Sequence, residues 1–329
     1  MENYLLINNS AFTIFAYFCQ VKIEGKYWIL LILLSLIWGS SFILMKRGMY
    51  TPSGEVVFNS NQVAALRLIL ASIVLLPFGY KAFKRINFKK DWLYFLLVAM
   101  CGNMFPAFLF TYAETGISSG FAGMLNSMTP IFTIFIGFGF FQVKMTWTQI
   151  IGSLLGSVGV VLLLFFGKSV SLKGEWVHII SVVIATLCYA ISLSVIRYKL
   201  KQYKSIDIAT IAFLILLIPS LIICTYEETW LVFINNSQAN SSFLAISILG
   251  LIGTAFALFL FNNIIKNTSA LFASSVTYFI PIVAVIIGFF FGERLSVYQI
   301  LSMFIVLSGV FLANFNSSKN NIVYITFVA

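Results

Sequence analysis

The chain has 329 residues, of which 60% are hydrophobic and only 9% are charged. So few charges cannot supply the surface of a soluble domain, which excludes that class. The net charge of +10 could indicate a nucleic-acid partner. Its distribution, described below, instead indicates a lipid bilayer and no nucleic acid.

Residues 1–26 precede the first long apolar segment and are interpreted as an N-terminal extension. The apolar stretch over residues 11–21 is too short to span a membrane. It also lacks the basic start and small-residue cleavage site of a signal peptide. A short interfacial helix and a disordered arm both fit this segment.

Long apolar segments follow one another along the rest of the chain, and each can cross about 30 Å of hydrocarbon. They do not alternate polar and apolar residues as barrel strands do. Backbone polar groups in lipid must then be bonded within helices, which predicts an all-α polytopic membrane protein with ten transmembrane helices. The predicted spans are 28–46, 59–80, 92–112, 118–140, 147–166, 176–197, 206–226, 243–263, 270–291 and 297–315.

The sequence repeats itself with a period of 151 residues, so that Pro130 matches Pro281 and Trp38 matches Tyr189. Each copy holds five spans, an odd number, so the second copy must enter the membrane from the opposite side. We therefore predict two inverted five-helix repeats, over 27–168 and 174–316, followed by a tail over 317–329. Inverted repeats are a construction plan of secondary transporters, with the substrate site near the midplane between the copies.

Basic residues are densest in two segments, Lys81–Lys90 and Arg197–Lys204. Both segments lie on one side of the membrane in the ten-span topology. The positive-inside rule assigns that side to the cytoplasm. The sequence therefore predicts an integral protein of a bacterial inner membrane with both termini cytoplasmic.

The two matched prolines are expected to kink spans 4 and 9 near their middles. Each proline would free the carbonyl four residues back, which belongs to Asn126 for Pro130 and to Thr277 for Pro281. Such a carbonyl is tolerated where it faces protein or a water-filled cavity. The pair therefore predicts either a cavity lining or a packing kink whose polar neighbour satisfies the carbonyl locally.

Two further polar pairs follow the same period. Ser41 matches Ser192, and Asn103 matches Thr254. Hydroxyl groups in spans often only bond across helices, and that interpretation stays open for the serines. The amide of Asn103 needs more partners than a hydroxyl, which favours a polar cavity.

Arg67 is the charge expected well inside a span, where insertion scales give a cost of about 2.5–3.5 kcal/mol. A functional interpretation makes it an anchor for an anionic substrate group. The alternatives are snorkelling toward one membrane face and a structural pair with backbone carbonyls.

Carboxylates that could couple transport to a proton lie near span ends. Glu114 lies in the short loop between spans 3 and 4, and Glu293 lies between spans 9 and 10. A solvated loop carboxylate is the alternative for Glu114, and a helix-end organiser is the alternative for Glu293. No spacing of His, Cys, Asp or Glu predicts a metal or another cofactor.

Several segments together resemble the EamA family of the drug/metabolite transporter superfamily. They are Trp38-Gly39-Ser40-Ser41-Phe42, the region from Tyr112-Ala113 to Pro130, and Pro281 through Gly292-Glu293-Arg294-Leu295 to Gln299 and Gly309. The resemblance implies ten helices, an inverted repeat, cytoplasmic termini, and export or exchange of small metabolites such as amino acids and their derivatives. Trp38 and Tyr189 fit the aromatic position of the two repeats. Where the family often has Gly-Glu in the first repeat, this chain has Gln142-Val143.

We expect a secondary transporter of small metabolites that works by alternating access, not an enzyme, as a monomer or homodimer. The alternatives are an uncoupled facilitator, a membrane-embedded enzyme and a non-transporting scaffold. The expected substrate-binding residues are Trp38, Ser41, Arg67, Asn103, Asn126, Tyr189, Ser192, Thr254 and Thr277.

Overall fold

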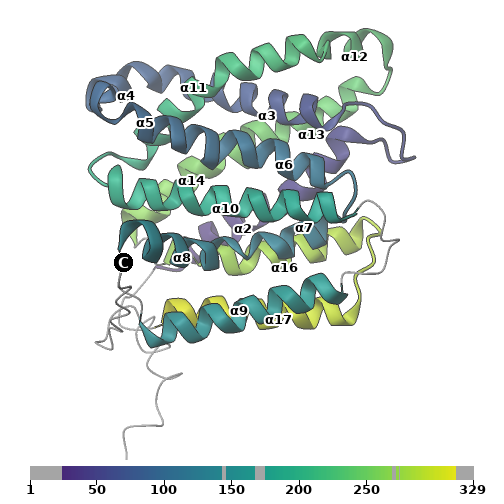
Figure 1. The fold of residues 1–329 in the computed structure, drawn as a ribbon. Helices are drawn as coiled ribbons and strands as arrows, with labels where there is room; N and C mark the ends of the chain where they lie inside the picture. The colour runs from purple at the N-terminus through teal and green to yellow at the C-terminus, as the bar shows by residue number, and fades with distance from the viewer. Residues whose placement is uncertain (1–23, 143–145, 167–174, 269–271, 274, 316–329) are drawn as a thin grey trace, which may run out of the picture.

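A computed structural model describes residues 24–142, 146–166, 175–268, 272–273 and 275–315. The predicted N-terminal extension, the position of Val143 and the tail lie largely or wholly outside these residues. Within the described ranges the chain is mainly helical, and an isolated antiparallel bridge joins Tyr50 to Val56. Figure 1 shows the helices running side by side, with loops gathered at two ends.

The helices before residue 167 follow the predicted spans 1 to 5. They are α2 (Gly25–Met49), α3 (Ser60–Leu75) with η1 (Leu76–Phe78) and α4 (Gly79–Arg85), α5 (Phe88–Ala99), η2 (Met100–Met104), α6 (Phe105–Ala113), α7 (Ser119–Asn126), α8 (Thr129–Phe141) and α9 (Trp147–Phe166).

The helices after residue 174 overlap the predicted spans 6 to 10, apart from a short helix over residues 229–235 that lies between the predicted spans 7 and 8. They are α10 (Glu175–Lys199), α11 (Ser205–Tyr226), α12 (Thr229–Asn235), α13 (Ala239–Gly250), η3 (Leu251–Phe256), α14 (Ala257–Asn267), α16 (Val276–Phe290) and α17 (Val297–Phe315).

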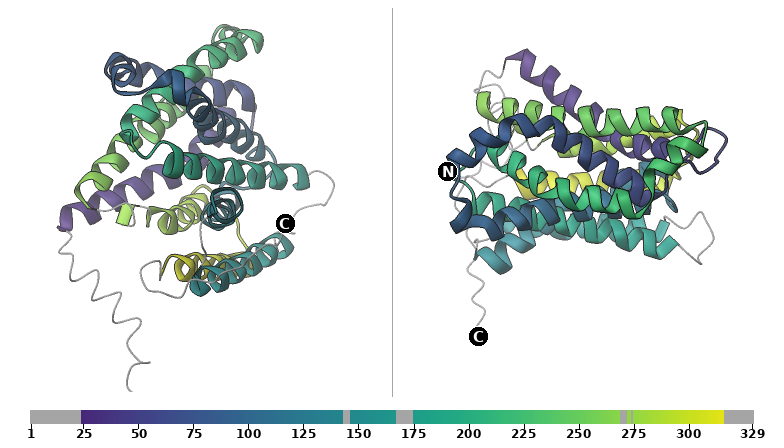
Figure 2. Two further views of the ribbon diagram at one scale, coloured as in Figure 1. Left: turned by 60° about the vertical axis from the view of Figure 1, so that its left-hand side comes forward. Right: turned by 90° about the horizontal axis from the view of Figure 1, so that it is seen from above.

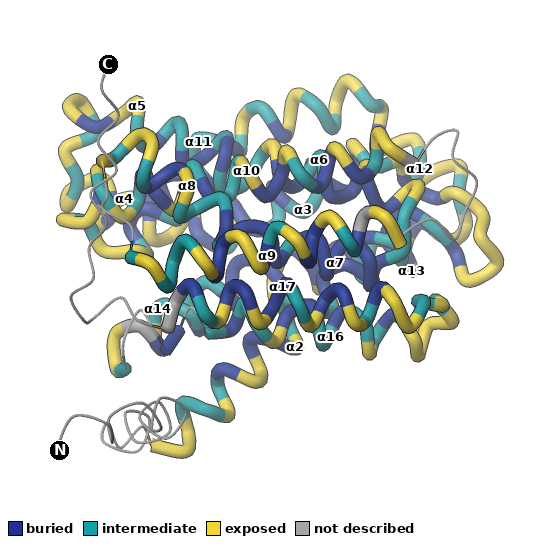
Figure 3. The backbone as a smooth tube through the Cα atoms, turned by 60° about the horizontal axis from the view of Figure 1, so that its bottom comes forward, coloured by how far each residue is buried: buried dark blue, intermediate teal, exposed yellow. Residues whose placement is uncertain are grey.

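Helix length and composition support membrane crossing. Among the described residues, seven helices are long and apolar enough to span a membrane. Three shorter apolar helices, Trp147–Leu163, Val276–Phe290 and Val297–Ala313, lie within the remaining predicted spans. Large apolar side chains such as Ile29, Phe140 and Phe289 are exposed, as expected where lipid is the solvent. Figure 3 shows such exposed positions along the outer helices. The chain is therefore an all-helical, multi-pass integral membrane protein.

Packing between helices brings distant parts of the chain together, as Figures 1 and 2 show. Helix α2 packs on α13, α14 and α16, whereas α10 packs on α5, α6 and α8. Helix α3 packs on α11, and α9 packs along α17. In the last pair, a Cβ on Gly309 would overlap the backbone of Gly156, so these glycines let two helix backbones approach. The Gly152-x-x-x-Gly156 pattern thus serves a contact within the chain.

The structure corrects the prediction for span 4. Helix α7 ends at Asn126 and a new helix, α8, begins at Thr129, so Pro130 lies in the first turn of α8 and not in the middle of a helix. Proline is well suited to that position because its missing N–H has no partner to lose there. Pro281 does lie inside its helix, α16.

Candidate functional site

Spans 3 and 8 each contain a π-helical segment that the sequence did not predict. These segments are η2 (Met100–Met104) and η3 (Leu251–Phe256), and their first residues match in the sequence repeat. A π segment holds an extra residue in its turn, is rare, and frequently occurs at functional sites. The same local irregularity therefore occurs at matching positions of the sequence repeat.

The predicted polar pair Asn103 and Thr254 lies in these segments. Asn103 Nδ2 donates to the carbonyl of Val98 at 3.3 Å, and Thr254 Oγ1 donates to the carbonyl of Leu249 at 3.0 Å. Both bonds run five residues back along the chain. The side chains thus satisfy carbonyls that the wide turns leave displaced from the ordinary α pattern.

The predicted serine pair packs on glycines of the same segments. A Cβ on Gly102 would clash with Ser192 Oγ, and a Cβ on Gly253 would lie 3.2 Å from Ser41 Oγ. The Ser41 hydroxyl also donates to the carbonyl of Ile37 at 3.0 Å. Span 1 therefore meets span 8 as span 6 meets span 3.

Aromatic side chains repeat the arrangement. The rings of Trp38 and Phe261 are 5.4 Å apart between centroids, and those of Tyr189 and Phe110 are 5.9 Å apart and stacked. Phe110 and Phe261 also match each other in the sequence repeat. The sequence predicted Trp38 and Tyr189 but did not identify their ring partners.

Arg67 departs from this repeat. Its Nε donates to Thr254 Oγ1 at 3.0 Å, and one terminal nitrogen lies 3.9 Å from the sulfur of Met45. Tyr189 lies near the Arg67 side chain. The matching position in the second repeat is Ile218, which is 67% exposed. Arg67 thus points into the helix bundle toward Thr254 and Met45, and its charge has no counterpart in the second repeat.

Asn126 and Thr277 are both half-buried, at the end of α7 and the start of α16. These helices pack together closely, since a Cβ on Gly123 would overlap Ala284. Whether these two polar residues line the substrate cavity stays a prediction.

A second polar cluster lies at one end of the bundle, where Glu293 joins three elements. Its Oε1 accepts from Lys46 Nζ at 3.0 Å and from the backbone N–H of Ser119 at 2.9 Å. Its Oε2 accepts from the backbone N–H of Gly120 at 2.9 Å. The Glu293 carboxylate therefore caps the first turn of α7 and neutralises the charge of Lys46 in the last turn of α2.

Glu114 is buried beside this cluster, with only 1% of the residue exposed. This corrects the interpretation of a solvated loop carboxylate. Glu114 caps α6 and turns back toward the start of α7, where the Ser119 hydroxyl donates to Oε2 at 2.8 Å. Its other oxygen, Oε1, is buried with no hydrogen-bond partner among the described residues.

The pKa values of the two carboxyl groups are shifted in opposite directions. Burial raises the pKa of Glu114 well above its ordinary value, and the Ser119 hydroxyl and Lys46 only partly offset this. Burial also acts to raise the pKa of Glu293, but the N–H of Gly120, the ammonium of Lys46 and the N–H of Ser119 hold it below its ordinary value. The cluster therefore favours ionisation of Glu293 at a pH at which Glu114 is still protonated.

An open depression of about 590 Å³ lies over this cluster. It is lined by Ile43, Lys46, Arg47, Tyr50, Thr51, Pro52, Gly54, Glu114, Thr115, Gly116, Ile117, Ser118, Phe291 and Glu293. The sequence singled out both carboxylates, but it gave no signal that Ser119 and Lys46 would join them.

Cysteines form one contact that their spacing concealed. The side chains of Cys101 in η2 and Cys188 in α10 lie close enough to interact. Within the described ranges, no three His, Cys, Asp or Glu side chains group as a metal site would require.

The fold is that of a helical membrane protein with repeated polar positions inside its bundle. Comparison with known proteins gives the family: the EamA-like transporter family matches residues 26–165 and again residues 176–315. The chain belongs to this family.

Relatives from several bacteria match over most of the chain. The uncharacterized transporter YdfC of Bacillus subtilis is 27% identical over 88% of this chain and 91% of its own length. The uncharacterized inner membrane transporter YedA of Escherichia coli K12 is 27% identical over 85% and 87%. An S-adenosylmethionine/S-adenosylhomocysteine transporter of Chlamydia muridarum is 27% identical over 65% and 68%.

A protein of known crystal structure has the same fold, with a TM-score of 0.55 over 88% of this chain and 96% of its own, at 12% identity.

Proposed function

We propose that the protein is a secondary transporter of small metabolites, built from two inverted five-helix repeats that move by alternating access. The helix contacts support this plan, because moving each helix by the repeat period of 151 residues converts one set of contacts into another. The contacts of α2 with α13, α14 and α16 become those of α10 with α5, α6 and α8. Two halves that meet in this way can rock against each other about a site near the midplane.

The substrate site in this proposal lies between spans 1, 3, 6 and 8. The observation that carries it is the set of N–H donors left on Arg67. A guanidinium has five donors, and the described residues accept only from Nε and weakly from one terminal nitrogen. A desolvated cation with free donors favours an anionic partner, and a carboxylate matches its planar geometry.

The substrate class that follows is a small solute with a carboxylate group, such as an amino acid or an amino-acid derivative. The rings of Trp38 and Tyr189 would pack against its apolar part, and Asn103, Thr254 and the two serines would supply hydrogen bonds. S-adenosylmethionine, which appears in the name of the Chlamydia relative, carries a carboxylate of this kind. Asn126 and Thr277 would line the same cavity from α7 and α16.

Export or exchange driven by an ion gradient is the proposed mode, with Glu114 and Glu293 as coupling groups. An uncoupled facilitator is the alternative. It is favoured because both carboxylates lie near span ends and not beside the proposed substrate site. A membrane-embedded enzyme is the weaker alternative, because the relatives are named as transporters.

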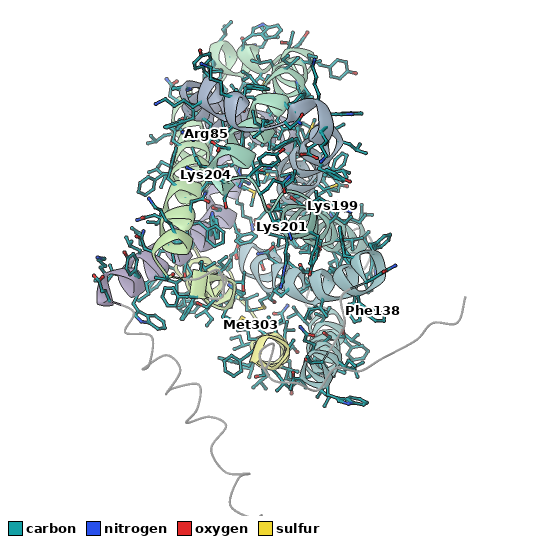
Figure 4. The ribbon with its side chains drawn as sticks, turned by 90° about the vertical axis from the view of Figure 1, so that its left-hand side faces the viewer. Arg85, Phe138, Lys199, Lys201, Lys204 and Met303 are labelled. Carbon is teal, nitrogen blue, oxygen red and sulfur yellow. The ribbon has the colours of Figure 1, made fainter. Side chains whose placement is uncertain are left out.

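The proposed orientation puts both termini in the cytoplasm of a bacterial cell, with the protein in the inner membrane. Figure 4 supports it, since Arg85, Lys199, Lys201 and Lys204 all lie at the end of the bundle that faces the viewer. Basic side chains concentrate on the cytoplasmic side of membrane proteins. The Glu114–Glu293 cluster would then face outward.

The test compares cells that express the wild type, Arg67→Gln or Arg67→Lys, with the metabolites inside and outside the cells measured without prior selection. The wild type should shift the distribution of one or more carboxylate-bearing solutes. Arg67→Gln should abolish that shift, and Arg67→Lys should retain part of it because the charge persists without the planar fork. Equal amounts of folded protein in the membrane are the control.

Normal transport by Arg67→Gln would refute the proposal that Arg67 binds the carboxylate of the substrate. A solute without an anionic group as the transported compound would refute the substrate class.

A further inference from the structure

The cluster around Glu293 joins parts of the chain that belong to different family matches. Lys46 and Ser119 fall within residues 26–165, whereas Glu293 falls within residues 176–315. A carboxylate from the second match thus caps a helix of the first and pairs with its Lys46. Its side chain is 9% exposed, so these bonds form in a largely desolvated place where they are strong. Separating the two halves at this end must break them.

The opposite end of the bundle cannot form the same cluster. In the sequence repeat, Glu293 matches Val143 and Glu114 matches Ile265. Lys46 matches Arg197, but this arginine lacks both carboxylates of the first cluster. The cluster around Glu293 therefore occurs at one end of the bundle only, whereas the contacts of Ser41 and Ser192 occur in both repeats.

Ser119 connects the two carboxyl groups directly. Its backbone N–H donates to Glu293, and its hydroxyl donates to Glu114. When Glu114 is protonated and neutral, the Lys46 ammonium pairs with the Glu293 carboxylate alone. The two acids and the ammonium then carry no net charge. An ionised Glu114 would put a second anion beside Glu293, with one oxygen buried and without a donor among the described residues. Burying such a charge unpaired is costly, and access of water to that oxygen relieves the cost.

We propose that Glu114, Glu293 and Lys46 form a proton-responsive latch between the two halves of the molecule, closed while Glu114 is protonated and released when Glu114 ionises. The latch deepens the proposed function, on which it rests for its role in transport: it would let an acidic solution close one mouth of the transporter. The raised pKa of Glu114 supports this assignment.

Other ionisable groups near Glu114 must be separated from it in the test. They are Lys46, Arg47, Tyr50, His178 and Glu293. His178 is the most relevant, since it contacts Thr115 at 3.1 Å and histidine ordinarily titrates near neutral pH. Lysine and arginine ordinarily stay charged over this range.

The experiment measures one distance across the latch by electron spin resonance on the full chain in lipid nanodiscs. Spin labels replace Val56, which is bridged to the end of α2, and Val297, which begins α17; both positions are exposed. The four native cysteines are replaced beforehand. The distance distribution is recorded between about pH 5 and about pH 9, a range that brackets a raised carboxyl pKa.

In the otherwise unchanged protein, we expect a short distance at low pH and a growing population of longer distances as the pH rises. Glu114→Gln, which mimics the protonated acid, should keep the short distance at every pH. Glu293→Gln should show the long distance even at low pH. Ser119→Ala removes a hydrogen bond to the ionised form of Glu114 and should move the transition to higher pH.

Two control variants isolate the latch. Glu55→Gln changes an exposed carboxylate at the same end and should leave the transition as it was. His178→Asn should also leave it unchanged. A distance that ignores pH, or a transition that survives in Glu114→Gln or disappears in His178→Asn, would overturn the proposal.

This readout needs no substrate, so it separates the latch from the transport function. A working latch in a protein that moves no solute would refute the proposed function alone. Transport that depends on Arg67, without a pH-dependent distance, would refute the latch alone.

Discussion

Ser192 Oγ occupies the space that a side chain on Gly102 would need. The contact joins span 6 to the π-helical segment of span 3, and Ser41 meets Gly253 in the same way on the other side of the repeat. These serines are therefore packed against helix backbones in close approach, with no room for a side chain at Gly102 and little room at Gly253.

The first prediction concerns this contact. Gly102→Ala should destabilise the protein by about 1–3 kcal/mol, the range typical of overpacking. Gly253→Ala should cost less, because its Cβ would lie 3.2 Å from Ser41 Oγ and needs only a small shift. Melting temperatures of the purified proteins in detergent measure both effects.

Ser192→Gly supplies the compensating change. Combined with Gly102→Ala, it should restore most of the lost stability because it removes the clashing hydroxyl. If the double variant melts no higher than Gly102→Ala, the clash is not the cause of the loss.

The second prediction uses the native cysteines. Cys101 lies in span 3 and Cys188 in span 6, and their side chains lie close enough to interact. Oxidation by copper–phenanthroline should join them by a disulfide bond and tie span 3 to span 6, which should lower transport. Peptide mass spectrometry detects the bond, and dithiothreitol should restore transport.

Cys188→Ala is the matched control and should be insensitive to the oxidant. A bond that forms without any change in transport would show that spans 3 and 6 keep their distance throughout the cycle.

The third prediction follows from the depressed pKa of Glu293. An unfolded glutamate titrates near about 4.3, so the capping bonds stabilise the fold above that pH and are lost as pH falls through the lower folded pKa. Glu293→Gln should therefore be less stable than the wild type at neutral pH, by about 1.5–3 kcal/mol for bonds to a charged group. The difference should disappear in strong acid.

Thermal unfolding of both proteins as a function of pH measures this difference. The exposed Glu55→Gln variant should match the wild type at every pH. A stability difference for Glu293→Gln that stays constant into strong acid would contradict an ionised capping carboxylate.

The fourth prediction is the topology. The loop at residues 84–89 and the loop at residues 227–230 lie at opposite ends of the bundle, near α4 and α12 in Figure 1. Lys89→Cys and Trp230→Cys, each in a protein without the native cysteines, should react with an impermeant thiol reagent from opposite sides. Labelling of both from one side of intact cells would refute the inverted repeat.

Much of the fold could be predicted because its signals are carried by composition and period. The apolar runs give the helices, and the sequence repeat identifies Asn103 with Thr254 and Ser41 with Ser192 before any coordinates are known. These positions do take part in the same contacts in both halves.

The parts that could not be predicted depend on neighbours distant in the sequence. Glu114 reads as a loop residue, and only the packing of α7 against it explains its burial. The π segments likewise leave no distinctive pattern in the residue types, since glycines such as Gly102 and Gly253 are also common in ordinary membrane helices. Pro130 indicated an irregularity in span 4, but proline fits both a kinked helix and the start of a new one.

The wide turns in spans 3 and 8 determine which way the side chains that follow them in the same span point. One extra residue rotates the rest of an α-helix by about 100° relative to the part before it, since a turn holds about 3.6 residues. Phe110 and Phe261 lie after these turns and meet Tyr189 and Trp38. Deletion of a single residue within η2 or η3 would therefore swing these rings off their partners, so chain length in these two turns is as tightly fixed as residue type.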